Sequence, residues 1–393
     1  SNARRTGYRP AAAAAQPPAA GPTHRDVTRA EPSDDIAWSA YHPERHGGPL
    51  HVVNVTVNET VTGTSRLAQR DRKGLPMAIG PCGLSVGRHH HALWDGDSGA
   101  VIPLPLPAGR FAVFPPGGGR ARNVEPLTVG QWVAVSGAAF TTGLGARTRL
   151  GLSMLLALSN VRLGYWWDSG ISPRERPVGR WRASEAAGAL LAAVAPVQTY
   201  LADETFARFH GPHRRRWYLS DGGHFENLGL YEMVMRRCRL IIVSDAGCDP
   251  VYAFQDLGNA IRKARVDLGI SIEMDGMPMR PRGVGTLFSD RDRPGGYCAV
   301  GRIIYPAAEN APDGVLIYLK PGLYGDEPVD VRNYASQNED FPHEPTSEQW
   351  FSEAQFESYR ALGAHVVEKV FGREAVPATI AEVEQRARRY AYG

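Results

Sequence analysis

Apolar residues recur along this chain with the spacing of strands in some stretches and of helices in others. Short apolar runs rich in β-branched or aromatic side chains predict strands at residues 51–57, 271–274, 298–305 and 315–320. Apolar residues that recur every three or four positions predict helices at residues 150–163, 184–194, 249–269 and 346–366. Because strands and helices occur along one chain, we expect an α/β fold.

The most informative stretch is residues 217–232, with the sequence WYLSDGGHFENLGLYE. Its first apolar residues predict a strand that delivers Asp221 to a turn, and residues 228–238 predict a helix. The apolar run at 239–244 is typical of a strand buried on both faces of a parallel sheet, and it leads to Asp245. The pattern is therefore strand, helix, strand, with an aspartate at the end of each strand.

The pair Gly222 and Gly223 distinguishes Asp221 from the other aspartate. Sites in open α/β sheets lie beyond the carboxyl ends of strands. Glycines permit backbone angles closed to other residues and let another backbone or a substrate come close. A carboxylate placed there can orient a serine hydroxyl and take its proton. An aspartate before two glycines is also a common turn residue, so the spacing leaves both interpretations open.

Ser136 is a candidate nucleophile with two interpretations. Residues 134–138, Ala-Val-Ser-Gly-Ala, resemble a Gly-x-Ser-x-Gly elbow but lack both outer glycines. An elbow also requires a helix directly after the serine, whereas Thr-Thr-Gly-Leu-Gly follows here. Alternatively, Thr128 caps a short helix over residues 129–138, in which Ser136 packs. We favour the helix and retain Ser136 as the alternative nucleophile.

Residues 218–249 resemble the patatin-like phospholipases, which are related to the cytosolic phospholipase A2 catalytic domain, and in particular a large bacterial branch of that family. The resemblance continues through residues 256–269 and 356–363 and covers roughly residues 50–370. It implies a three-layer α/β/α hydrolase core and a serine hydrolase of lipid acyl esters that needs no cofactor or metal. In that family the aspartate of Asp-Gly-Gly is half of a Ser-Asp dyad, a role that falls here on Asp221.

The position of the nucleophile stays open. In the bacterial relatives, a glycine-rich oxyanion loop and a Gly-x-Ser-Gly-type elbow precede the segment that matches residues 51–58, and neither is present here. The glycines at 117–119 lie too close to Ser136 for the helix and strand that separate loop and nucleophile in that fold. Either Ser136 substitutes, or an upstream part of the same protein holds the serine. The alternative is a non-catalytic pseudoenzyme or interaction module on the same fold.

Composition narrows the class of partner. The 393 residues carry 44 Lys and Arg against 41 Asp and Glu, a net charge of +3, so no basic field argues for nucleic acid. The four cysteines form no Cys-x-x-Cys pair, which fits a reducing compartment. No apolar stretch reaches the roughly eighteen residues of a membrane span. We expect a cytoplasmic protein, or one peripheral to the cytoplasmic face of a membrane. The resemblance to patatin-like phospholipases implies a lipid or acyl ester as substrate and the membrane surface as a partner.

Other polar clusters predict no site. Consecutive histidines at 89–91 point in different directions on any regular backbone, so we expect no metal there or at His210, His213 and His224. We interpret the arginines at 214–216 as a solvated loop.

Three parts of the chain differ in organisation. Residues 1–35 read as a tag remnant and disordered linker, 36–345 as the patatin-like α/β core, and 346–393 as a C-terminal helical extension. Within the core, the many glycines and prolines of residues 66–126 predict an irregular excursion over the sheet, and the apolar helix at 150–163 should be buried.

The start of the extension has the form of a capping box. Thr346, with glutamine three residues later, should open its first helix. Ser352, Glu353 and His365 should then lie on the surface of that helix.

Overall fold

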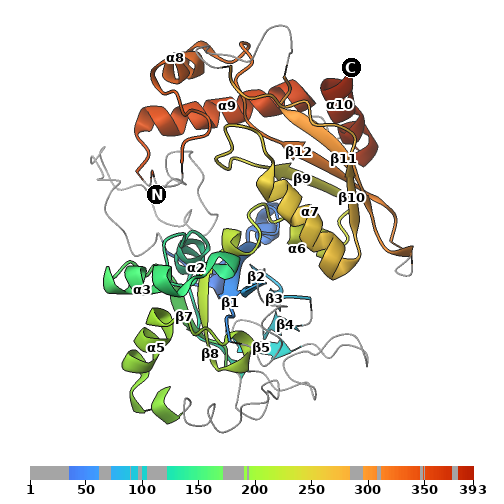
Figure 1. Cartoon of the computed structure of the whole chain (residues 1–393). Helices are drawn as coiled ribbons and strands as arrows, with labels where there is room; N and C mark the ends of the chain where they lie inside the picture. Colours follow the sequence, from blue (N-terminus) through green and yellow to red (C-terminus); the bar gives the residue numbers. More distant parts are fainter. Residues whose placement is uncertain are drawn as a thin grey trace, which may run out of the picture. The chain divides into compact units, whose positions relative to one another are not determined.

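The computed structural model describes residues 35–61, 72–88, 90–95, 100–103, 122–170, 190–192, 194–283, 295–307, 311–345, 348, 350–373 and 379–393. The chain divides into two compact units, Ser1–Phe225 and Glu226–Gly393 (Figure 1). This division differs from the boundaries predicted at residues 35 and 345. No helix in the described ranges combines the length and apolarity that crossing a bilayer requires.

The first unit contains an eight-stranded sheet in which every neighbouring pair is antiparallel, in the order β6-β5-β4-β3-β2-β1-β8-β7. Its strands are β1 (Val53–Asn58), β2 (Gly74–Gly80), β3 (Gly83–Val86), β4 (His90–Trp94), β5 (Ala100–Pro103), β6 (Arg122–Asn123), β7 (Tyr165–Asp168) and β8 (Arg216–Asp221). The unit also has the helices α2 (Val129–Ser136), α3 (Leu150–Leu158) and α5 (Pro196–Thr205).

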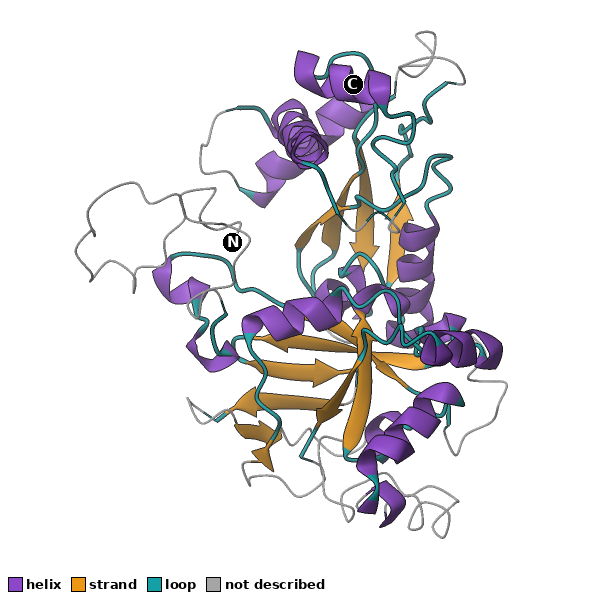
Figure 2. Ribbon diagram, turned by 90° about the vertical axis from the view of Figure 1, so that its left-hand side faces the viewer, coloured by secondary structure: helices purple, strands orange, loops and turns teal. Residues whose placement is uncertain are grey.

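The second unit is built on a four-stranded sheet in the order β10-β11-β12-β9, in which β12 and β9 are parallel. Its elements are α6 (Leu230–Met235), β9 (Leu240–Ser244), α7 (Gln255–Leu268), β10 (Ser271–Met274), β11 (Cys298–Ile304), β12 (Gly314–Leu319), α8 (Val329–Gln337), α9 (Glu353–Phe371) and α10 (Ile380–Tyr392). Alternate residues of β12 enter different cores. Leu316 packs in the cluster with α6 and α7, whereas Ile317 packs in the cluster with α8, α9 and α10. Helices therefore cover both faces of this sheet (Figure 2).

Local patterns identified many of these elements. The strands predicted at 51–57, 271–274, 298–305 and 315–320 are confirmed as β1, β10, β11 and β12. The helix predicted at 249–269 begins only at Gln255, because Tyr252 and Phe254 have positive φ values of 53° and 54° that no helix contains. Most of the helix predicted at 184–194 lies outside the described residues.

The strand, helix and strand predicted at residues 217–244 do not build one parallel sheet. β8 pairs antiparallel with β1 and β7, and β9 pairs with β12. Aromatic side chains explain the choice of β7, because Trp217 lies opposite Trp167 with ring centroids 5.5 Å apart. β9 is also not buried on both faces, since Ile242 is 48% exposed.

Residues 66–126 are not an irregular excursion where the structure describes them. They supply β2 to β6, and Gly74, Pro76, Gly80 and Gly83 lie within these strands. Gly80 pairs with Gly83 across a turn of only Pro81 and Cys82, which makes a tight hairpin. Residues 104–121 of this stretch lie outside the described residues.

The apolar helix predicted at 150–163 exists, but it ends at Leu158 and is not buried. Ser153 is its only buried residue, and Leu158 is 81% exposed. The sequence pattern reports how apolar this helix is, and it contains no information on what covers the helix.

The first helix of the C-terminal extension begins at a different cap from the one predicted. Ser352 accepts a hydrogen bond from the backbone N–H of Gln355 at 3.1 Å, and the Gln355 side chain accepts one from the Ser352 N–H at 3.3 Å. This capping box opens α9, so Ser352 is not a surface residue within the helix. His365 is also not on a free surface, because its ring contacts Asp326 and Tyr297.

Replacing the cap should destabilise the second unit. We expect Ser352→Ala to lower the free energy of unfolding by about 1 kcal/mol, because the Gln355 N–H loses its partner. Ser352→Gly is the matched control and should cost only a few tenths of that amount. Urea unfolding followed by circular dichroism measures both. Equal stability of Ser352→Ala and the wild type would contradict this assignment of the cap.

Candidate functional site at the Asp-Gly-Gly turn

Asp221 is the last residue of β8 and lies opposite Val55 of β1. Its Oδ1 atom accepts a hydrogen bond from the Gly223 N–H at 2.7 Å, so the carboxylate caps the turn that follows it. The side chain is partly exposed. Within the described ranges, no ion pair includes Asp221, and no hydrogen bond is made to its Oδ2 atom. The carboxylate is thus held in one orientation with one oxygen available.

The lack of a side chain, rather than unusual backbone angles, explains the glycine at this turn. Neither Gly222 nor Gly223 has a positive φ, and together with His224 they form a short 3-10 turn, so the prediction of special angles is wrong. A Cβ atom on Gly222 would lie 2.6 Å from the Asn54 carbonyl oxygen. The close approach of another backbone is therefore confirmed at Gly222, and it fixes the turn against β1.

Ser136 lies at the C-terminal end of α2. The helix is capped by Thr128, whose hydroxyl accepts a hydrogen bond from the Gln131 N–H, so the prediction of a capped helix here is confirmed. The Ser136 hydroxyl donates to the Asn54 carbonyl oxygen at 2.7 Å. A nucleophile elbow would place the hydroxyl at a helix N-terminus instead.

The structure brings Ser136 and the Asp-Gly-Gly turn against one residue of β1. The Asn54 carbonyl oxygen accepts the Ser136 hydrogen bond, and it is also the atom that a Cβ on Gly222 would approach most closely. Among the described residues, no hydrogen bond joins Ser136 to Asp221. The two predicted site residues are therefore neighbours of a common group and are not bonded to each other.

Three polar residues beside Asp221 were not predicted as part of the site. Ser220 accepts a hydrogen bond from the Asn58 side chain at 2.8 Å, and its Oγ atom lies 2.9 Å from His224 Nδ1. Ser220 and Asn58 are fully buried. A buried hydroxyl cannot reach a substrate, so these residues position the strand end that carries Asp221. The only sequence signal for them is the four-residue spacing of Ser220 and His224 around the turn.

The surroundings of His224 disfavour its charged form. Burial lowers the pKa of its imidazole below the usual 6.5, although the negative charge of Asp221 and a contact with the Ala139 carbonyl act in the opposite direction. A neutral imidazole can accept a hydrogen bond from the Ser220 hydroxyl at Nδ1. The chain therefore places a carboxylate and an imidazole at the two ends of one short turn.

Asp245 is at the end of β9, as predicted, but its carboxylate is neutralised. It is buried, and it pairs at 3.2 Å with Lys320, which directly follows the parallel strand β12 and is also buried. The Tyr318 hydroxyl donates to its Oδ2 atom, and the Gly247 N–H donates to Oδ1 at 2.8 Å. These partners occupy the carboxylate, so Asp245 ties two strand ends together.

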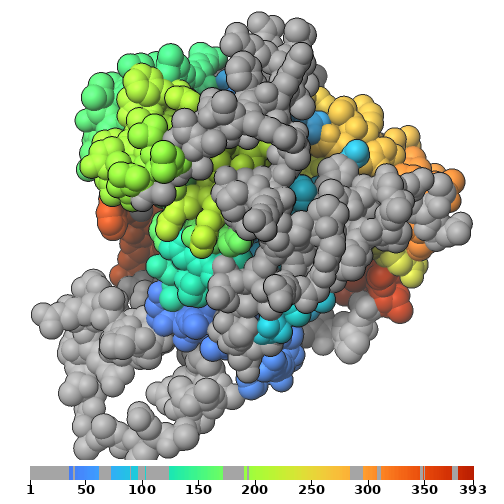
Figure 3. Space-filling model, turned by 90° about the horizontal axis from the view of Figure 1, so that it is seen from below, coloured from blue at the N-terminus to red at the C-terminus, as the bar shows by residue number. Residues whose placement is uncertain are grey.

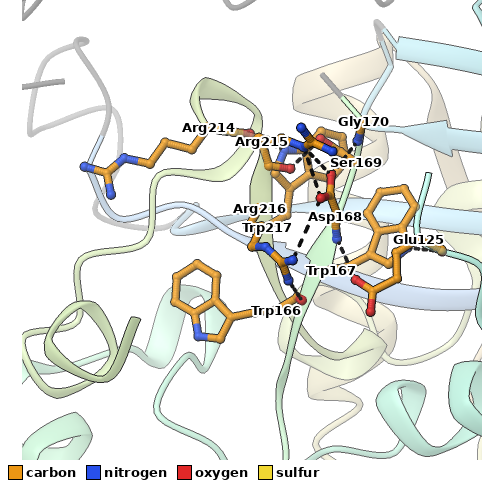
Figure 4. Close-up of polar contacts among 10 residues, drawn as sticks. All are labelled: Glu125, Trp166, Trp167, Asp168, Ser169, Gly170, Arg214, Arg215, Arg216 and Trp217. Carbon is orange, nitrogen blue, oxygen red and sulfur yellow. Dashed lines mark hydrogen bonds and ion pairs between the residues drawn. The ribbon is translucent and has the colours of Figure 1, made fainter. Parts of the chain in front are cut away.

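The arginines at 214–216 are ion-paired rather than simply solvated. Arg215 donates to both carboxylate oxygens of Asp168, at 2.8 and 3.0 Å, and Arg216 lies 3.9 Å from the same carboxylate (Figure 4). Arg214 pairs with Asp203 at 3.1 Å, and both side chains are largely buried. Two carboxylates thus balance much of this positive charge and fix the start of β8.

The described residues contain no group of three His, Cys, Asp or Glu side chains that could hold a metal ion. His90 and His91 are consecutive residues of β4, and the His91 ring is hydrogen-bonded to Ser85 at 2.9 Å. His89 lies outside the described residues. All four cysteines are free thiols.

Comparison of the chain with protein-family models, with curated proteins and with solved structures found no match.

Adding a methyl group at Gly222 should disrupt the turn. We expect Gly222→Ala to lower the free energy of unfolding by on the order of 1–3 kcal/mol, because its Cβ would collide with a β1 carbonyl that cannot move aside. Gly151→Ala on α3 is the matched control: nothing lies within 4 Å of its new Cβ, and it should be neutral or stabilising by about 1 kcal/mol. Seven of the eight tryptophans precede residue 226, so fluorescence during urea unfolding reports on the first unit. Equal effects of the two changes would contradict the close approach.

The lowered pKa of His224 predicts that acid weakens the first unit. Its folded pKa lies below the unfolded value of about 6.5, so the unfolded chain binds more protons as the pH falls below that value. Stability should therefore be level above about pH 6.5 and decrease toward pH 5. His224→Gln should make this decrease smaller, whereas His46→Gln, at an exposed histidine, should leave it unchanged. Tryptophan fluorescence in urea at pH 7 and pH 5 measures the difference, and an unchanged decrease in His224→Gln would refute it.

Proposed function

We propose that this chain supplies the aspartate of a Ser-Asp lipid acyl hydrolase of the patatin-like type. The observation that carries the proposal is the state of Asp221. One carboxylate oxygen is fixed by the Gly223 N–H, and the other has no partner among the described residues. A catalytic base needs this combination of fixed orientation and an available oxygen. Asp245, at the other predicted strand end, has no available oxygen, because Lys320 and Tyr318 bind its Oδ2 atom and the Gly247 N–H binds Oδ1.

In the proposed reaction, Asp221 accepts the proton of a serine hydroxyl while that serine attacks the carbonyl carbon of an acyl ester. The protonated Asp221 gives this proton to the oxygen of the leaving alcohol as the ester bond breaks, and an acyl-serine remains. Water then attacks the acyl-serine, Asp221 again serves as the base, and the fatty acid is released. The serine recovers its proton in this step, so the cycle is closed without a metal or cofactor.

We place the nucleophilic serine upstream of this chain in the same protein, rather than at Ser136. The Ser136 hydroxyl is engaged with the Asn54 carbonyl and lies at the C-terminal end of α2. The negative end of a helix dipole disfavours a serine alkoxide and the oxyanion that follows from it. The resemblance to patatin-like proteins, in which the elbow precedes the segment matching β1, points in the same direction. The same resemblance supports a three-layer α/β/α core for the complete hydrolase.

The second candidate is a non-catalytic pseudoenzyme or interaction module on the same fold. One observation favours it: among the described residues, no serine hydroxyl is hydrogen-bonded to Asp221. This candidate predicts a correctly folded protein without esterase activity, even with its upstream sequence present.

A fluorophosphonate probe separates these possibilities. We expect residues 1–393 alone to show no adduct by peptide mass spectrometry, and the protein with its natural upstream sequence to be labelled at an upstream serine. An adduct at Ser136 would show that this serine is the nucleophile. Absence of labelling in both proteins, when both are folded, would support the pseudoenzyme.

Substitution of Asp221 tests the base directly. In the protein with its upstream sequence, Asp221→Asn should lower kcat/KM for a chromogenic acyl ester on the order of 10²–10⁴-fold, because the amide cannot accept the serine proton. Asp313→Asn, at an exposed ion pair with Arg302, is the control and should leave the rate unchanged. Ser136→Ala should also be nearly silent. Turnover near the wild-type rate in Asp221→Asn would disprove the dyad.

A further inference from the structure

Helix α3 exposes an unusually apolar surface. It contains no charged residue, and its sequence is LGLSMLLAL. A helix that is apolar on all sides is normally buried. Here Leu155 is 60% exposed and Leu158 is 81% exposed.

Helix α5 extends this apolar surface. It packs beside α3 in the first unit, and both helices lie at one side of that unit (Figure 1). Val197 is 72% exposed and Leu201 is 41% exposed, four positions apart and therefore on the same side of α5. Figure 3 shows green atoms of this part of the chain on the outer surface. We call Leu150, Met154, Leu155, Leu158, Val197 and Leu201 the α3–α5 face.

Positive charge flanks α3, and the two acidic residues of α5, Asp203 and Glu204, are buried and paired with arginines. No aspartate or glutamate occurs between Glu125 and Asp168, whereas Arg147, Arg149 and Arg162 do. Arg147 and Arg149 are exposed just before α3, and Arg162 follows the helix, partly exposed and 3.8 Å from Glu204.

The position of Arg149 indicates that this arginine does not stabilise α3. Arg149 is the residue that precedes the first turn of α3, and it makes no side-chain capping hydrogen bond. A positive charge at a helix N-terminus is unfavourable, because that end of the helix dipole is itself positive. An external anion would relieve this repulsion.

We infer that the α3–α5 face docks this protein on the surface of an anionic lipid bilayer. Exposed leucines flanked by arginines are the pattern of interfacial helices, whose apolar side chains enter the boundary between headgroups and acyl chains while basic side chains meet phosphates. The nine residues of α3 extend about 14 Å, too short to cross a bilayer, so the helix lies along the surface. The charge pattern favours an anionic membrane over an apolar protein partner, for which the arginines would have no role.

This inference goes beyond the proposed hydrolase and does not depend on it, because binding to lipid can be measured without turnover. The probe is sedimentation with sucrose-loaded vesicles of phosphatidylcholine alone or with 30% phosphatidylglycerol (a chosen test composition). We expect binding to the anionic vesicles to be at least about tenfold stronger, and to weaken with added salt.

Two sets of variants distinguish the apolar and the charged contributions. Leu155→Asp with Leu158→Asp should reduce binding about tenfold or more, and Val266→Asp, at a valine of α7 that is 68% exposed, is the control that should not. Arg147→Glu with Arg149→Glu should reduce binding to anionic vesicles only. Arg149→Glu places a negative charge at the N-terminus of α3, which stabilises the helix. A loss of binding would therefore not result from unfolding of α3. Circular dichroism verifies that each variant is folded.

Two results would overturn the inference. Vesicle binding of the leucine variant equal to that of the wild type would show that another surface binds lipid. The second result is that the wild type does not bind vesicles but either self-associates or binds the upstream part of the protein. If the leucine variant abolishes that association, the α3–α5 face is a protein interface. Size-exclusion chromatography with light scattering detects self-association, and pull-down with the separately produced upstream segment detects the other case.

Discussion

The antiparallel pairing of β1 with β8 is the constraint on which the candidate site depends. It places Val55 opposite Asp221 and Thr56 opposite Ser220, and these positions fix where the β8 strand ends. The buried Asn58 side chain adds a hydrogen bond to Ser220, which a one-residue shift in register would break. Ser136 and Gly222 then meet at the Asn54 carbonyl because α2 and the turn both pack against this strand. The geometry of the site is thus a property of a strand pair that is distant in sequence.

Burial and partners give chemically identical carboxylates different roles. Asp221 and Asp245 each follow a strand and each accept a hydrogen bond from a backbone N–H two residues later. Asp245 is additionally buried with Lys320. Separating a buried ion pair is costly in free energy, because each charge would be left buried without a partner. Asp221 remains at a partly exposed edge. The difference comes from Lys320, which is 75 positions away in the chain and directly follows β12, the parallel neighbour of β9.

Features that depend on a few adjacent residues could be predicted from the sequence. The Thr128 cap, the short strands of the second unit and the aspartate at the end of β8 all follow from local patterns. Pairing of β8 with β1 and β7 could not be predicted, since apolar runs of similar length do not identify their partners. The exposure of α3 was missed for a related reason: apolar composition indicates the environment a helix favours, and the sequence does not say which surface provides it. His224 and Ser220 become recognisable only when Asn58 is brought beside them.

One contact links the candidate site to the α3–α5 face. Gly145 begins the 3-10 turn that leads to α3, and its N–H donates to the Asn58 side chain at 3.0 Å. A Cβ on Gly145 would lie 2.3 Å from the His224 carbonyl oxygen, so this turn is pressed against the Asp-Gly-Gly turn. Asn58 thereby holds Ser220 with its amide nitrogen and Gly145 with its oxygen. The turn that leads to α3 and the strand end that carries Asp221 are thus held by the same buried side chain and packed directly against each other, as the dense interior of a protein requires.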